Sequence, residues 1–197
     1  MQGVKWHPVF GNHDYGSSAG VQAQIDRTFQ SDDDEWTFPE RNYTKKFKVS
    51  SSSSLYVVFI DTTTLCPSVT SATNSKGGIS TSVQEARITD QLYHIEKNLK
   101  LILEEMNQRE DWLFMVGHYP VFSQGEHGDT AENIQYLLPI LENYPIHAYI
   151  SGHDHISEHL QVQIYKDVII ISITITIIII ISILQAERTI SSQEQGV

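Results

Sequence analysis

The chain has 197 residues, a length that suits one domain with a sizeable hydrophobic core. Its 13 basic and 24 acidic residues give a net charge of −11. This charge argues against a nucleic-acid partner, because proteins that bind nucleic acids present a basic surface to them. Any attraction for an anionic substrate must therefore be local, from metal ions or from the nine histidines.

Strands and helices are predicted to alternate in the first half of the chain. Residues 5–10 and 45–49 are predicted as short strands, and residues 21–29 as a helix. Residues 55–60 form a continuous apolar run, which predicts a strand buried on both faces. The Pro-, Gly- and Ser/Thr-rich stretch 66–81 predicts a long loop.

The clearest helix is predicted over residues 83–109. Apolar side chains recur there at three- and four-residue steps and form one stripe: Ile88, Leu92, Ile95, Leu99, Ile102, Leu103 and Met106. Residues 112–116 and 147–150 predict strands, and residues 130–144 predict a helix interrupted at Pro139. This order of elements predicts an α/β fold.

The last thirty residues follow a different pattern. Residues 168–184 carry no charge, and 11 of these 17 residues are isoleucine. Isoleucine alternates with threonine or serine over part of the segment, which favours a strand. A membrane-spanning helix is the rival interpretation, although 17 residues would reach only about 25 Å of a core about 30 Å thick. Residues 185–197 are predicted to be a polar tail.

Four short segments place imidazole or carboxamide groups beside glycine. They are Gly11-Asn12-His13-Asp14, Gly117-His118-Tyr119-Pro120, Gly125-Glu126-His127-Gly128 and Gly152-His153-Asp154-His155. Three of the four follow a short apolar run, so we expect them to be loops at one edge of a sheet. Oxygen and imidazole donors without thiolates suit iron, zinc or manganese.

In this order, the segments resemble the motifs of the calcineurin-like metallophosphoesterases. The neighbouring Val121-Phe122-Ser123 and Glu126-His127-Gly128 resemble the purple (tartrate-resistant) acid phosphatases within that group. The resemblance implies an α/β fold, a fragment of a β-sandwich flanked by helices in α-β-β-α layers. Residues 1–167 would be an incomplete phosphoesterase domain, followed by the Ile-rich segment 168–184 and the tail 185–197.

The resemblance also implies hydrolysis of a phosphate monoester at a binuclear metal centre, with iron and a divalent ion (zinc, manganese or iron). The implied ligands of the divalent ion are Asn12, His118 and His153. His155 would bind the iron. The histidines implied to contact the phosphate and protonate the leaving alkoxide are His13 and His127. Asp14 and Asp154 would orient neighbouring imidazoles or cap the loops.

Two ligand segments of the resembled family have no counterpart in this sequence. In the family, an Asp-x-Gly segment and a Gly-Asp-x-x-Tyr segment precede Asn-His-Asp and supply the aspartate that bridges the metals. Here the second ion would keep only His155. We therefore expect impaired phosphatase activity; the alternative is a non-catalytic remnant that binds at most one divalent ion. In the family, the missing upstream segment should also carry two strands from the middle of the sheet. Without these two strands, the apolar faces left exposed should promote self-association.

The remaining residues give weaker indications. Cys66 is the sole cysteine, so an internal disulfide is excluded and a buried or loop thiol is expected. The first 15 residues lack the pattern of a signal peptide, although the family resemblance implies a secreted or lysosomal protein. Four further histidines are expected to pack or to face solvent: His7, His94, His147 and His159.

Overall fold

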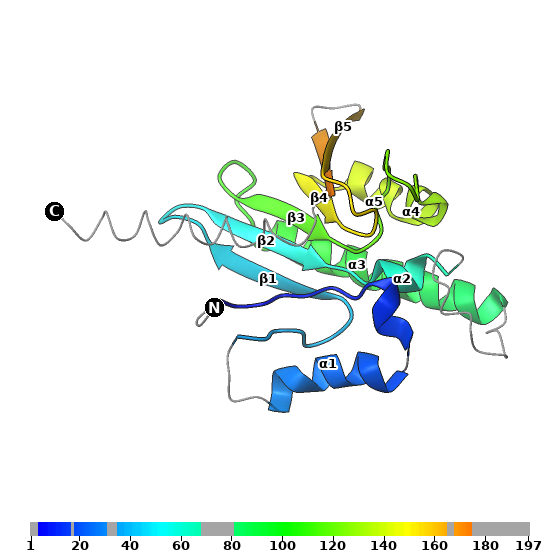
Figure 1. Ribbon diagram of the computed structural model, residues 1–197. Helices are drawn as coiled ribbons and strands as arrows, with labels where there is room; N and C mark the ends of the chain where they lie inside the picture. The colour runs from blue at the N-terminus through cyan, green and yellow to red at the C-terminus, as the bar shows by residue number, and fades with distance from the viewer. Residues whose placement is uncertain (1–3, 17, 31–34, 68–80, 165–167, 175–197) are drawn as a thin grey trace.

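The computed structural model describes residues 4–16, 18–30, 35–67, 81–164 and 168–174. Its strands are β1 (Tyr43–Lys48), β2 (Ser54–Phe59), β3 (Trp112–Val116), β4 (Ala148–Ser151), β5 (Glu158–Ile164) and β6 (Val168–Thr174). They form one six-stranded sheet in the order β1-β2-β3-β4-β6-β5 (Figure 1). The four inner strands are parallel, and β1 and β5 pair antiparallel at the two edges.

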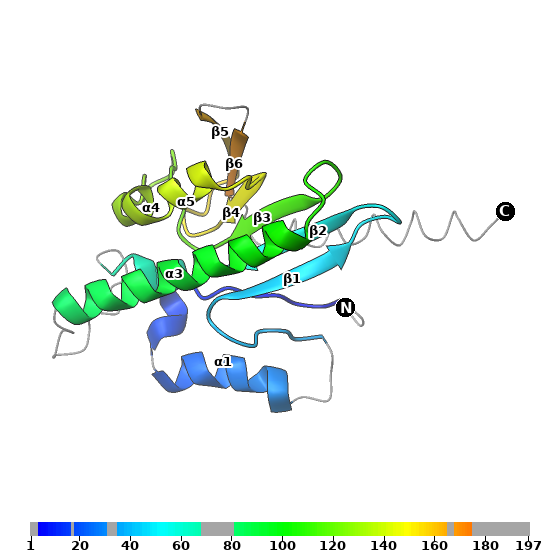
Figure 2. The same ribbon diagram turned by 180° about the vertical axis from the view of Figure 1, so that it is seen from behind.

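Helices cover both faces of this sheet. They are the 3-10 helix η1 (Asn12–Gly16), α1 (Ser18–Gln30), α2 (Thr62–Leu65), α3 (Thr81–Glu105), α4 (Ala131–Tyr136) and α5 (Leu138–Asn143). The long helix α3 crosses the sheet on the face turned to the viewer in Figure 2. Helix α1 packs against the opposite face. The predicted α/β class is confirmed, and the described residues contribute a single sheet.

Successive side chains of β2 point to opposite faces of the sheet and so belong to two separate parts of the core. Tyr56 and Val58 pack into the cluster under α3, together with the stripe predicted for that helix. Val57 and Phe59 point the other way, toward Val21 of α1. Because successive strand side chains point to opposite faces, a continuous apolar run is what a strand buried on both sides requires.

Several predicted elements are confirmed with small changes of boundary. Helix α3 ends at Glu105 rather than at residue 109, and the helix predicted over residues 130–144 is divided into α4 and α5. Pro139 lies in the first turn of α5, where its missing N–H removes no helical hydrogen bond. Most of the predicted loop 66–81 lies outside the described residues.

The strand predicted at residues 5–10 is wrong. This segment is extended, and among the described residues its regular backbone pairing is a single bridge between Trp6 and Trp36. The Trp6 N–H donates to the Glu35 carbonyl at 2.5 Å, and the Thr37 N–H donates to the Trp6 carbonyl at 2.9 Å. An apolar segment becomes a strand only beside a partner of sufficient length, and residues 35–37 are a short partner.

The Ile-rich segment enters the sheet. Val168–Thr174 forms β6 between β4 and β5, which confirms a strand over this part of the segment. Residues 175–184 and the predicted tail 185–197 lie outside the described residues. No helix within the described ranges has the length and apolar character needed to span a membrane. Strand β5 was not predicted, although Leu160-Gln161-Val162-Gln163-Ile164 alternates with period two.

The four histidines expected outside the site pack or face solvent, as predicted. His94 and His159 are exposed, and the His147 Nδ1 accepts a hydrogen bond from the Leu113 N–H at 3.0 Å. The ring of His7 packs against Phe47 and Phe59, with centroids 5.3 and 5.9 Å apart.

His7 makes the stability of the fold depend on pH. Its Nδ1 is buried and has no hydrogen-bond partner in the described part of the chain. Burial, together with the charges of Lys45 and Lys5, lowers the pKa of His7 to about 4. The neutral ring is therefore favoured in the folded state, whereas the unfolded chain titrates near 6.5.

The free energy of unfolding is expected to fall as the pH drops from about 6.5 toward 4, because the unfolded state takes up the proton first. In His7→Phe this loss should be smaller than in the parent chain. Urea unfolding at pH 7.0, 5.5 and 4.5 measures the difference. The exposed His94→Phe is the matched control, and equal pH dependence in the two variants would contradict the assignment.

Candidate metal centre

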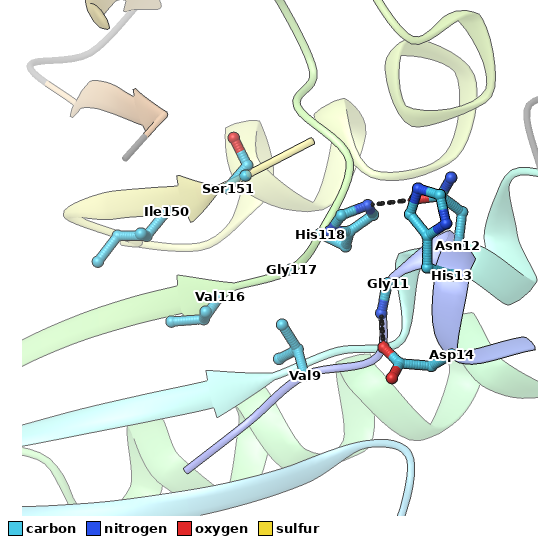
Figure 3. Close-up of a pocket in the computed structure, with 11 residues that line it drawn as sticks. Val9, Gly11, Asn12, His13, Asp14, Val116, Gly117, His118, Ile150 and Ser151 are labelled. Carbon is cyan, nitrogen blue, oxygen red and sulfur yellow. Dashed lines mark hydrogen bonds between the residues drawn. The ribbon is translucent and has the colours of Figure 1, made fainter. Parts of the chain in front are cut away.

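Three candidate ligands come together at one edge of the sheet, and Figure 3 shows two of them, Asn12 and His118. His118 follows the end of β3, and His153 follows the end of β4. Asn12 begins η1, which lies beside the same strand ends. Because β3 and β4 are parallel, the loops that leave them lie side by side.

The donor atoms of these three side chains are close together. His118 Nε2 lies 2.8 Å from Asn12 Oδ1 and 3.2 Å from His153 Nδ1. Metal–nitrogen bonds of about 2.0–2.1 Å place neighbouring donors roughly 3 Å apart, so these separations are of the right size for one shared ion. The carboxamide and two imidazoles are a donor set that suits a borderline divalent metal.

Burial favours the neutral form of the two imidazoles. It lowers the pKa of His118 to about 4, and the neighbouring His153 contributes to the same effect. The pKa of His153 is also lowered, first by burial and then by His127. A neutral imidazole is the form that binds a metal.

The loop that carries His118 is fixed by buried polar groups. Thr62 Oγ1 accepts hydrogen bonds from the N–H groups of His118 and Tyr119, at 3.0 and 2.9 Å. Asn133 Nδ2 and the Tyr149 hydroxyl both donate to the Tyr119 carbonyl, at 2.9 and 2.5 Å. Sequence reasoning did not find Thr62, Asn133 or Tyr149; the sole local signal was the Asp61-Thr62-Thr63-Thr64 run after β2.

A second network holds η1 against the end of β2. The Tyr15 hydroxyl donates to buried Asp61, and Arg41 donates to both groups, with an Arg41 Nη1–Asp61 Oδ2 separation of 3.2 Å. Asp14 caps the same turn, because its Oδ2 accepts the Gly11 N–H at 2.8 Å. Asp14 therefore caps a loop, one of the two roles foreseen for it. These contacts fix the helix that begins with Asn12.

The two histidines expected to handle protons lie near the three donors. The ring centroid of His127 is 4.5 Å from that of His153, at an interplanar angle of 31°. His13 is exposed and lines a groove of about 320 Å³ beside His118. The apolar wall of this groove comes from Val9, Val116 and Ile150 (Figure 3).

Within the described residues, His155 is not joined to the other candidate ligands by a hydrogen bond or a ring contact, although its charge acts on His118 and His153. It is exposed, has a positive φ of 51°, and makes no hydrogen bond or ring contact in the described part of the chain. Within the described ranges, no group of three or more His, Cys, Asp or Glu side chains is arranged to hold a metal ion. The donors present therefore fit one ion, through two histidines and a carboxamide, and they do not fit a second.

Comparison with known proteins gives the family. The pattern of the calcineurin-like phosphoesterase family matches residues 1–157. Tartrate-resistant acid phosphatase type 5 of Sus scrofa is 34% identical, over 82% of this chain and 44% of the relative. The Homo sapiens protein is 33% identical over 82% of this chain and 46% of its own length. Purple acid phosphatase 7 of Arabidopsis thaliana is 32% identical, over 79% of this chain and 44% of that protein.

Solved structures share the fold at lower sequence identity. A dimetal phosphatase from Danio rerio matches with a TM-score of 0.54 and 15% identity, over 85% of this chain and 59% of that structure. GAP50, the anchor in the inner membrane complex of Plasmodium, matches with a TM-score of 0.55 and 22% identity, over 86% of this chain and 50% of that structure. The chain spans less than half the length of the acid phosphatases named above. By the match over residues 1–157, the chain belongs to the calcineurin-like phosphoesterase family.

Proposed function

We propose that this chain is a metal-dependent phosphate monoester hydrolase of the acid phosphatase type. The observation that carries the proposal is the convergence of Asn12, His118 and His153 within 2.8–3.2 Å at the strand ends. The similarity to tartrate-resistant and purple acid phosphatases supports the same chemistry.

The metal ion would be held by Asn12 Oδ1, His118 Nε2 and His153 Nδ1. When bound, such an ion polarises phosphoryl oxygens and lowers the pKa of a bound water. The Asn12 carboxamide adds no negative charge to the site, and burial keeps His118 neutral.

His13 and His127 would act on the substrate directly. His127 packs beside His153 and is exposed, so its ring can reach a bound ester and donate a proton to the leaving alkoxide. His13 lines the groove next to Asn12, where its N–H groups would contact the phosphate. Imidazole is the side chain that most readily both donates and accepts a proton near neutral pH, which suits these two residues to the proposed role.

The iron of a binuclear centre does not fit the described residues. His155 is its sole implied ligand in the chain, and one imidazole does not hold an ion against water. We therefore derive no step through a second metal.

The test is hydrolysis of p-nitrophenyl phosphate at pH 5–6 by the purified chain, with zinc, manganese or iron added. Metal-dependent turnover is expected in the parent chain and in His94→Ala, whereas His127→Ala should lose about 100-fold or more in kcat. Soluble, folded protein that binds metal but shows no turnover would contradict the proposal.

A second candidate is a non-catalytic domain that binds one divalent ion. It is favoured by the ligand count, because the described residues supply three donors to one ion and only His155 to another. Elemental analysis of the purified protein distinguishes the two candidates. One bound ion without turnover supports the non-catalytic candidate, and two tightly bound ions, one of them iron, would exclude it.

A further inference from the structure

The carboxylate of Asp154 lies between two loops that carry candidate site residues. Asp154 is only 6% exposed, and it stands between His153 and His155 in the chain. Its Oδ1 accepts a hydrogen bond from the backbone N–H of His127 at 2.7 Å. Its Oδ2 is buried and has no hydrogen-bond partner in the described part of the chain. Within the described residues, the hydrogen bond of this buried carboxylate therefore goes to the other loop.

The loop that carries His127 is shaped to receive this carboxylate. A Cβ on Gly125 would lie 2.6 Å from Asp154 Cγ and 2.8 Å from its Oδ2, so the backbone of the turn rests directly on the side chain. The Gly128 N–H closes the turn by donating to the Gly125 carbonyl at 3.2 Å. A side chain at position 125 would separate the two loops.

The loop that carries Asp154 needs restraint. His153 and His155 have φ angles of 72° and 51°, in the left-handed region that residues with a side chain seldom adopt. Such conformations cost on the order of 1 kcal/mol each and persist only where surrounding contacts hold them. Two backbone bonds help: Gly152 N–H to the His118 carbonyl, and Asp154 N–H to the Gly152 carbonyl, both at 2.9 Å.

We infer that Asp154 is a positioning residue that joins the turn of His127 to the turn of His153. Its carboxylate supplies the cross-link, and Gly125 supplies the space for it. The cross-link fixes the 4.5 Å separation between the rings of His127 and His153. The candidate proton donor is thereby held at a set distance from a candidate metal ligand. The inference rests on the proposed function for the role of His127, and the cross-link itself can be measured without any activity.

The test compares Asp154→Ala, which removes the acceptor, with Asp154→Asn, which keeps one oxygen acceptor and the shape. Two readouts are used: hydrogen exchange of the His127 amide by NMR, and zinc affinity by calorimetry. In Asp154→Ala we expect amide exchange to rise about tenfold and zinc affinity to fall about tenfold, as is typical when a partner that orients a ligand is lost. Asp154→Asn should restore most of both values. The exposed Glu126→Ala, in the same turn, is the control and should change neither.

Gly125→Ala tests the contact from the other side. Alone, it should reproduce the effects of Asp154→Ala, because the new methyl group displaces the carboxylate. Combined with Asp154→Ala, it should add less than it costs alone, since the Cγ and Oδ2 atoms are gone and only the Cβ of residue 154, at 2.9 Å, remains in its way. Additive effects in the double variant would contradict the contact.

The outcomes separate the inference from the proposed function. Unchanged amide exchange and zinc affinity in a folded Asp154→Ala protein would overturn the inference, whatever the activity. If Asp154→Ala does not fold, Gly125→Ala gives the same two readouts in its place, and unchanged values in that variant would overturn the inference. Altered exchange in a protein that hydrolyses no phosphate ester would leave the cross-link standing and remove the proposed function alone.

Discussion

Replacement of His118 by alanine is expected to lower the zinc affinity of this chain by more than about 100-fold. Loss of a group that merely orients a ligand already costs about 10–100-fold, and His118 is proposed as a ligand itself. Its Nε2 is the common point of the donor cluster, at 2.8 Å from Asn12 Oδ1 and 3.2 Å from His153 Nδ1. Isothermal titration with zinc at pH 7, where burial keeps His118 neutral, measures the loss.

The matched control is His94→Ala on the exposed side of α3, which removes an imidazole outside the site. It should bind zinc as the parent chain does. Thermal unfolding of His118→Ala without metal should stay close to the parent value, since the loop is held by Thr62, Asn133 and Tyr149 rather than by the imidazole. Equal zinc affinity in the parent and His118→Ala would place the metal elsewhere.

The grouping of Asn12, His118 and His153 was predicted from the resemblance to a family, and local patterns account for the two histidines. An apolar strand followed by glycine and histidine places the histidine at the strand end, and parallel strands bring such ends together. The resemblance to a family then supplied the chemistry. His155 shows the limit of this reasoning, because in the described part of the chain it makes no hydrogen bond or ring contact with the other donors.

The supports of the site could not be predicted in the same way. Thr62 holds His118 from 56 residues away, and Tyr149 holds Tyr119 from 30 residues away, through hydrogen bonds to backbone atoms. Such bonds leave no periodic pattern in the sequence. The error at residues 5–10 has a related cause, since strand pairing depends on a partner that the local pattern does not specify.

Gly117→Ala is expected to destabilise the fold by about 3 kcal/mol. A Cβ at position 117 would lie 2.6 Å from the Tyr149 hydroxyl and 2.7 Å from Thr62 Cγ2, which are contacts that real structures do not show. Neither neighbour can move freely. Tyr149 is buried and donates to the Tyr119 carbonyl, and Thr62 accepts two backbone hydrogen bonds. Urea unfolding of the metal-free protein measures the change in the free energy of unfolding.

Gly152→Ala is the matched control, because its Cβ would come no closer than 3.8 Å to His118 Nδ1, an ordinary contact. This substitution should lower the free energy of unfolding by no more than about 1 kcal/mol. Tyr149→Phe removes the atom that Gly117→Ala would strike, so the double variant should be less destabilised than the sum of the two single variants. If Gly117→Ala were as stable as Gly152→Ala, the loop before His118 would have room to shift, and Thr62 and Tyr149 would not fix its position.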